Sequence, residues 1–251
     1  MDGFAVVATH HKTGSVWMCR VFKQIATKLG IPFVKIAPGR EPSAAPGIPA
    51  IVFSNHSNFR SLPGLLERPK TKIVHLIRDP RDIVISGMHY HRDAREQWLH
   101  RPDPDLDGMT YQQKLNSLSD DHSRYLFEMQ HNAKRTIKGM RRWNYSLPNA
   151  MECKYEDLIN DVEMVTFTKM IVHLGFTPDE QNLCRKYFWD RSLFGNAKKI
   201  KPGHVKSGSS QQWREAFDRQ LAGKFIEEFG DSLIELGYEN DNSWIETLSG
   251  S

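Results

Sequence analysis

The chain has 251 residues, of which 39% are hydrophobic and 25% are charged, and its formal net charge is +4. These values are ordinary for a globular protein and exclude disorder of the chain as a whole. The length is enough for one α/β domain with a full core, so we expect a single domain over residues 1–251. The basic excess is spread along the chain and by itself selects no partner.

The three cysteines are an odd count without a C-x-x-C pair, which predicts a reducing compartment and no structural zinc. The amino terminus lacks a basic region followed by a long apolar run, and no apolar stretch is long enough to span a bilayer. We therefore expect a cytoplasmic protein that binds neither membrane nor nucleic acid.

The chain begins with a predicted strand, loop and helix. Residues 4–8 are a short apolar run typical of a buried strand. After a turn at residues 10–15, apolar residues follow at helical spacing as far as Leu29, and Gly30 is the expected C-cap.

Strands and helices continue to alternate along the chain. Strands are predicted at residues 31–36, 50–53, 72–77 and 150–154, and helices at 82–91, 111–118, 123–140 and 162–174. This alternation predicts an α/β fold with a parallel sheet flanked by helices. Residues 93–147 are a polar helical insertion that we expect to cover a binding site, and the Pro- and Gly-rich residues 38–49 are a predicted surface loop.

The first loop has the composition of an anion site. Lys12, Thr13, Gly14 and Ser15 lie where a strand leads into a helix, and the free N–H groups and dipole of a helix start favour a bound anion. The loop of nucleotide triphosphatases has its Lys directly after the last Gly. Here Lys12 precedes Gly14, so that motif is absent.

Two segments resemble the PAPS-dependent sulfotransferases, where PAPS is 3′-phosphoadenosine 5′-phosphosulfate. The first fits the pattern K-[ST]-G-[ST]-x-W of the family's phosphosulfate loop, and its residues are Lys12, Thr13, Gly14, Ser15, Val16 and Trp17. The second is R-D-P-R-D at residues 78–82, with Ser86 in the following predicted helix. The resemblance implies that Arg78 and Ser86 bind the 3′-phosphate.

The residues themselves allow two interpretations of the second segment. An Arg at a strand end and a Ser about one turn into the next helix can close on one phosphate. The alternative is a set of surface ion pairs among Arg78, Asp79 and Arg81.

The resemblance extends from residue 9 to residue 213. Near the carboxyl end the family has R-K-G and a later Trp, and this chain has Lys206, Ser207 and Gly208 before Trp213. Because Lys is a point charge whereas Arg is a planar fork, this end of the phosphate site is less rigidly specified.

Adenine contacts are implied at four positions by the same resemblance. They are Trp17, Tyr155 of the Y-E-D segment, and Ser192 and Phe194 of the S-x-F segment. A core position is the alternative for Trp17.

His56 is the candidate general base. In the family's small-molecule enzymes a His stands about 22 residues before the strand-end Arg, and His56 has this spacing from Arg78. It follows the strand at residues 50–53, at the edge where ligands bind in open α/β sheets. His89 and His91 are the competing candidates, and His11 is expected to orient backbone.

The resemblance implies a P-loop-like fold that transfers a sulfuryl group from PAPS to a hydroxyl or amine of a small molecule and releases the product PAP. Lys12 is expected to stabilise the leaving group and His56 to accept the proton. No metal is expected, because Lys12, the loop amides and the helix dipole supply the stabilisation. A kinase-like phosphoryl transferase and a non-catalytic nucleotide-binding module are the alternatives.

The sequence also departs from the dimer motif of cytosolic sulfotransferases. That motif, K-x-x-x-T-V-x-x-x-E, follows the late Trp, whereas this chain has Arg214, Asp218, Arg219 and Gly223 at its marked positions. We expect a monomer, or a dimer that does not use residues 214–223.

Overall fold

The computed structural model describes residues 1–37, 42, 44, 46–197 and 209–248. These described residues form two compact units, one drawn from residues 1–78 and 143–209 and one from residues 79–142 and 210–248. Each unit is described by itself below, and the single domain over residues 1–251 stays a prediction.

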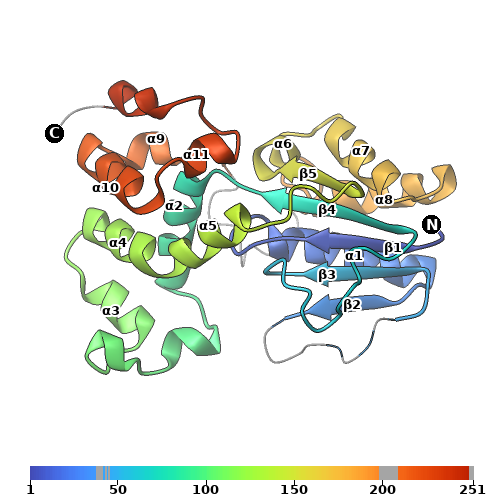
Figure 1. Ribbon diagram of the computed structural model, residues 1–251, viewed down its shortest axis with the longest axis horizontal. Helices are drawn as coiled ribbons and strands as arrows, with labels where there is room; N and C mark the ends of the chain where they lie inside the picture. The colour runs from blue at the N-terminus through green and yellow to red at the C-terminus, as the bar shows by residue number, and fades with distance from the viewer. Residues whose placement is uncertain (38–41, 43, 45, 198–208, 249–251) are drawn as a thin grey trace. The chain divides into compact units, whose positions relative to one another are not determined.

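The first unit contains a parallel sheet of five strands within its described residues (Figure 1). The strands are β1 (Phe4–Ala8), β2 (Phe33–Ile36), β3 (Ala50–Ser54), β4 (Thr71–Ile77) and β5 (Ala150–Lys154). Their order is β2-β3-β1-β4-β5, with every neighbouring pair parallel. The predicted α/β class and parallel sheet are confirmed.

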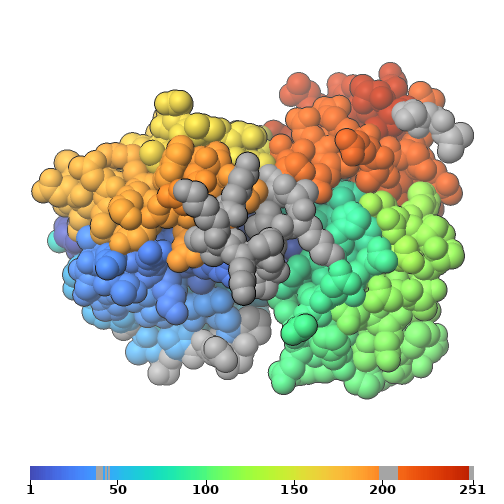
Figure 2. Space-filling view, turned by 180° about the vertical axis from the view of Figure 1, so that it is seen from behind, coloured from blue at the N-terminus to red at the C-terminus, as the bar shows by residue number. Residues whose placement is uncertain are grey.

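Four helices pack against one face of this sheet. They are α1 (Ser15–Leu29), α6 (Tyr155–Ile159), α7 (Val165–His173) and α8 (Pro178–Arg191). α1 and α8 lie side by side and form much of the first unit's surface in Figure 2. Gly30 ends α1 with φ 67°, as expected for a C-cap.

Loops cover the opposite face of the sheet. Strand side chains alternate between two cores, so Ala5 and Val7 face the helices while Val6 faces the loops. Phe59 and Leu62 from the segment after β3 contribute to this second core, together with Leu65, Trp143 and Leu147. Both faces are therefore closed within the first unit, and the strand ends carry the polar loops.

Local capping shifts one predicted helix and explains another that periodicity did not reveal. Helix α7 begins at Val165 because Asp161 accepts hydrogen bonds from the amides of Thr166 and Phe167. Helix α8, at residues 178–191, has a capping box between Thr177 and Glu180. Its T-x-x-E signal is visible in the sequence.

The second unit is helical in its described part. Its main helices are α2 (Pro80–His91), α3 (Tyr111–Ser117), α4 (Asp121–Glu128), α5 (Lys134–Arg141) and α10 (Arg219–Phe229). A π-helical turn, Met129–Ala133, joins α4 to α5, so the predicted helix at 123–140 is present but interrupted.

Short helices complete the second unit. They are η1 (Gln97–His100), η2 (Pro104–Leu106), α9 (Trp213–Ala216), α11 (Ser232–Glu235) and η5 (Asn242–Thr247). None of the helices described in either unit has the length and apolar character needed to cross a membrane. The expected role of residues 93–147 as a cover stays a prediction.

Arg81 is the centre of the second unit's core. Its guanidinium carbon lies 3.6 Å from the ring centre of Trp213 and 4.7 Å from that of Trp244. Its nitrogens lie 2.8 Å from Asp79 and 2.6 Å from Glu239. With Arg81 2% exposed, this is a buried cation rather than the surface ion pair considered above.

Arg81→Ala should lower the free energy of unfolding by about 3–5 kcal/mol, because it leaves the buried Asp79 carboxylate and the partly exposed Glu239 without their cation. Arg214→Ala is the matched control, since its exposed guanidinium also lies over the Trp213 ring, at 4.6 Å, and should contribute less than about 1 kcal/mol. Urea unfolding followed by tryptophan fluorescence measures both, and equal losses would contradict the assignment.

Candidate functional site

The loop after β1 is held by its own backbone and hydroxyl groups. The carbonyl of His10 accepts from the amide of Thr13 at 3.2 Å, from its hydroxyl at 2.9 Å, and from the hydroxyl of Ser15. Lys12 and Gly14 have φ of 65° and 85°, in the left-handed region. Turns with alternating backbone conformations form concave sites lined by N–H groups, which suit an anion.

Strand β4 delivers Arg78 to this loop. Its Nη1 donates to the carbonyl of Lys12 at 3.1 Å, and its guanidinium carbon lies 4.5 Å from the ring centre of Tyr155. Arg78 is 4% exposed, so the surface ion pair alternative is wrong for this residue. The sequence-predicted residues Lys12, Arg78 and Tyr155 are therefore brought together in the first unit.

Aromatic side chains form a wall beside the loop. An ideal Cβ on Gly14 would lie 2.9 Å from the Tyr155 ring, so the glycine allows this close approach. Trp17 lies edge-on to Tyr155 and stacks on Phe188, at centroid distances of 6.5 and 5.2 Å. Phe194 lies 5.9 Å from Phe188. Trp17 is thus half-buried against the core while its ring remains beside the loop.

The other residues predicted to contact the nucleotide have no contact with the Lys12 loop among the interactions described. Ser192 is buried and its hydroxyl donates to the carbonyl of Phe188 at 2.6 Å, so in this structure it caps α8. Val16 is 48% exposed in the first turn of α1. Ser86 is partly exposed on α2 of the second unit, and Lys206, Ser207 and Gly208 lie outside the described residues.

His56 lies in the turn that follows β3. Three hydrogen bonds hold this turn against Thr9. The Thr9 amide and hydroxyl donate to the Ser54 carbonyl at 2.9 and 3.0 Å, and the Ser57 hydroxyl donates to the Thr9 carbonyl at 3.0 Å. Because β1 and β3 are parallel neighbours, the turn shares a sheet edge with the Lys12 loop. His56 itself is exposed.

His89 and His91, the competing bases, belong to the second unit. The His91 ring is fully buried, with Nδ1 2.8 Å from Glu128 and Nε2 3.3 Å from the Asn132 amide. The Tyr111 hydroxyl donates to the same carboxylate, and burial, reinforced by that charge, raises the pKa of Tyr111. A ring enclosed in this way serves the packing of its own unit, so the geometry disfavours His91 as a base.

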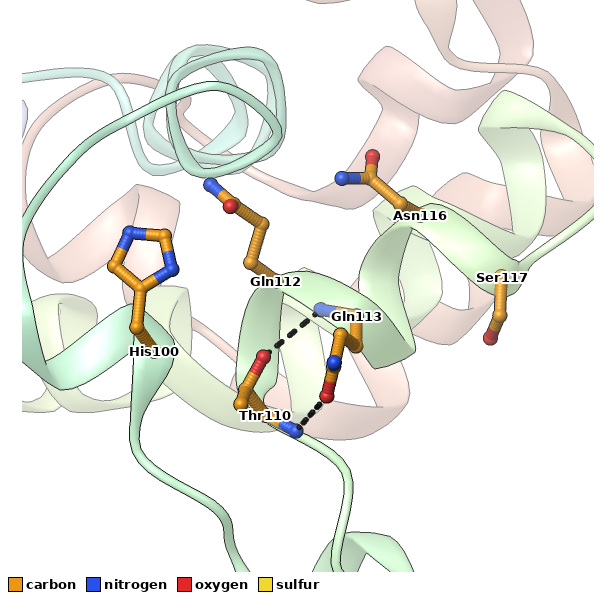
Figure 3. A pocket seen from close by; sticks show the side chains of 6 residues that line it. All are labelled: His100, Thr110, Gln112, Gln113, Asn116 and Ser117. Atoms are coloured by element: carbon orange, nitrogen blue, oxygen red, sulfur yellow. Dashed lines mark hydrogen bonds between the residues drawn. The ribbon is translucent and has the colours of Figure 1, made fainter.

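A polar pocket of about 580 Å³ also lies in the second unit (Figure 3). Its amide groups are already engaged: Gln112 donates to two backbone carbonyls, and Gln113 forms a capping box with Thr110. Asn116 exchanges hydrogen bonds with Arg92. These contacts hold the unit together, and we assign no ligand to the pocket.

Two histidines that the sequence did not single out contact each other where the loop begins. His10 and His75 approach with Nε2 atoms 2.8 Å apart, and both are buried. Burial lowers the pKa of each, that of His10 well below its usual value. The signal for His75 was a polar residue within the apolar run of β4. No cluster of metal-ligating side chains occurs among the described residues.

The sequence matches the family model of the sulfotransferase domain over residues 4–237, which is nearly the whole chain. The chain belongs to the sulfotransferase family. Among curated relatives, sulfotransferase 6B1 of Homo sapiens is 24% identical over 98 residues. That alignment covers 36% of this family member and 32% of the human protein, as does the match to sulfotransferase 6B1 of Pan troglodytes.

Solved structures share the fold of this sulfotransferase family member. Mouse sulfotransferase SULT7A1 complexed with PAP has a TM-score of 0.58 at 16% identity, over 98% of this chain and 87% of that chain. Retinol dehydratase in complex with androsterone and inactive cofactor PAP has a TM-score of 0.55 at 15% identity, over 92% and 80% of the two chains. The predicted sulfotransferase fold is confirmed.

Gly14→Ala should lower the free energy of unfolding by about 1–3 kcal/mol, because alanine is strained at positive φ and its Cβ would meet Tyr155. Gly223→Ala is the control: it lies inside α10 with open space around it and should be neutral or stabilise by up to about 1 kcal/mol. Thermal unfolding of both variants tests this, and a Gly14→Ala protein as stable as the parent would contradict the described loop.

Proposed function

We propose that this chain is an enzyme that transfers a sulfuryl group from PAPS to a hydroxyl or amine of a small-molecule acceptor and releases PAP. The observation that carries the proposal is the Lys12 loop held by Arg78 beside Tyr155. This places a cation, an anion-binding turn and an aromatic face together, which are the groups a phosphosulfate nucleotide requires.

The proposed reaction is an in-line displacement at sulfur. The acceptor oxygen or nitrogen forms a bond to sulfur while the bond from sulfur to the bridging oxygen of PAPS breaks, and PAP leaves with that electron pair. Lys12 stabilises the charge that grows on the bridging oxygen. His56 takes the proton that the acceptor loses.

The relatives support the proposed donor and acceptor classes. Three of the structural neighbours are complexes with PAP, and one retinol dehydratase complex contains androsterone while another contains retinol. These ligands belong to those proteins and support a small-molecule acceptor here. The kinase-like alternative requires a Gly-Lys-[Ser/Thr] loop that this chain lacks.

PAP and PAPS should bind much more tightly than ATP, because Arg78 is proposed to contact a 3′-phosphate that ATP lacks. Arg78→Ala should weaken PAP binding by at least about tenfold, the effect of losing one charged hydrogen bond. Arg185→Ala, a change at a partly exposed position of α8, should leave the affinity unchanged. Titration calorimetry with the three nucleotides decides, and equal affinity for ATP and PAP would refute the proposed donor.

Lys12→Ala should lower kcat by about 10²- to 10³-fold while PAP affinity falls less. The negative charge that Lys12 is proposed to stabilise develops on the bridging oxygen in the transition state. Lys28→Ala, at the far end of α1, is the control and should keep the parental rate. Labelled PAPS with a panel of phenols, alcohols, amines and sugars gives the assay. A Lys12→Ala enzyme with parental kcat would remove Lys12 from the chemistry.

His56→Ala should reduce turnover by about 10²- to 10⁴-fold and leave PAP binding nearly unchanged, because its partner is the acceptor proton. In the parent enzyme the rate should fall on acidification, since only neutral imidazole accepts a proton. His89→Ala and His91→Ala are the comparison. If His56→Ala remains active while one of these is dead, the base lies on α2.

A further inference from the structure

The His10 and His75 pair has a defined direction. At 2.8 Å between two Nε2 atoms, one ring must supply an N–H and the other a lone pair, because two protons or two lone pairs would repel. The contact is therefore a single hydrogen bond, whose donor depends on the tautomer of each ring. The proposed mechanism gives neither ring a role.

Glu152 selects the donor. It pairs with His75 in the register of β4 and β5, and its Oε2 lies 3.6 Å from Nδ1 of His75. This distance is too long for a direct hydrogen bond, but a carboxylate favours an N–H over a lone pair facing it. With its proton on Nδ1, His75 accepts at Nε2, so His10 is the donor.

The His75 ring is fixed by its surroundings. It stacks on Trp143 with centroids 4.3 Å apart and planes 11° apart, and Tyr145 lies edge-on at 5.7 Å. The ring is 1% exposed. Because the acceptor ring cannot turn away, the hydrogen bond fixes the position of the donor, His10, as well.

His10 transmits this position to the loop. Its carbonyl receives the three hydrogen bonds from Thr13 and Ser15 described above, and its amide donates to the Thr13 hydroxyl at 2.9 Å. The side chain is thus anchored to β4 while the main chain organises the turn. Lys12 lies inside that turn, in a left-handed conformation that needs such support.

We propose that His75 is a positioning residue for Lys12, which it orients through a directional hydrogen bond from His10. Strand β4 then holds the loop twice, at the His10 ring through His75 and at the Lys12 carbonyl through Arg78. The inference rests on the proposed function, because it concerns where the Lys12 charge is placed during sulfuryl transfer.

Burial keeps the pair neutral. Burial lowers the pKa of His10, and positive charge on His75 or His56 would lower it further. Burial lowers the pKa of His75, and Glu152 partly opposes that effect. Protonation of either ring is therefore disfavoured near neutral pH, where the hydrogen bond requires one lone pair.

The kinetic test compares variants of similar size. His75→Phe should reduce kcat by about tenfold, the effect of one lost hydrogen bond, while PAP affinity changes less than about threefold. His75→Gln keeps an acceptor within reach of His10 and should restore most of the rate. His173→Phe is the control, since His173 bonds only to the backbone carbonyls of Ile73 and Asn149 among its described hydrogen bonds and should keep parental kcat.

A double-mutant cycle separates positioning from loss of packing. If His75 acts through His10, the double variant of His10→Phe and His75→Phe should turn over no more slowly than the His10→Phe variant alone. Additive losses, an unaffected His75→Phe enzyme, or a His75→Gln enzyme as slow as His75→Phe would each overturn the proposal.

A second measurement does not depend on sulfuryl transfer, and its main readout uses the parent protein. Nitrogen-15 NMR of the parent protein should show the proton of His75 on Nδ1 and that of His10 on Nε2, and Glu152→Gln should weaken this preference. The reverse tautomers would overturn the proposed direction of the hydrogen bond from His10 to His75. If the tautomers are as expected but the protein is inactive with PAPS, the proposed function is refuted while the hydrogen bond from His10 to His75 stands.

Discussion

The candidate site of the first unit depends on the contact between Arg78, which follows β4, and the loop after β1. Lys12 and Gly14 both have left-handed backbone conformations, and such a turn persists only where its surroundings determine it. The Arg78 guanidinium provides this by donating to the Lys12 carbonyl while lying against Tyr155. One buried cation therefore links the end of β4, the loop that contains Lys12 and the aromatic wall.

Two arginines in one short segment have different structural roles. Arg78 directly follows β4 and contacts the loop of the first unit, whereas Arg81 lies in the core of the second unit beside two tryptophan rings. Asp82 also contributes to this core, because its carboxylate accepts hydrogen bonds from the amides of Gln211 and Trp213. The R-D-P-R-D segment thus combines the cation that contacts the Lys12 loop with the core contacts of a helical unit.

Residue type and spacing in the sequence identified one candidate histidine but not the buried histidine pair. Spacing from Arg78 selected His56, and the structure holds its turn at the same sheet edge as the Lys12 loop. Neither spacing nor composition revealed that His10 and His75 form a buried pair. Their contact arises because β1 and β4 are neighbours in register, with Ala8 opposite His75, and this register joins residues far apart in the sequence.

The sequence by itself determined the parallel α/β sheet, the strand, loop and helix around Lys12, the Gly30 cap and the family, because these depend on periodicity, caps and motifs within a few residues. The tertiary structure decided which polar groups meet. It directed the Ser192 hydroxyl to its own helix, buried Arg81 between Trp213 and Trp244, and paired His10 with His75. Such partnerships depend on strand order and packing, which no local pattern in the sequence encodes.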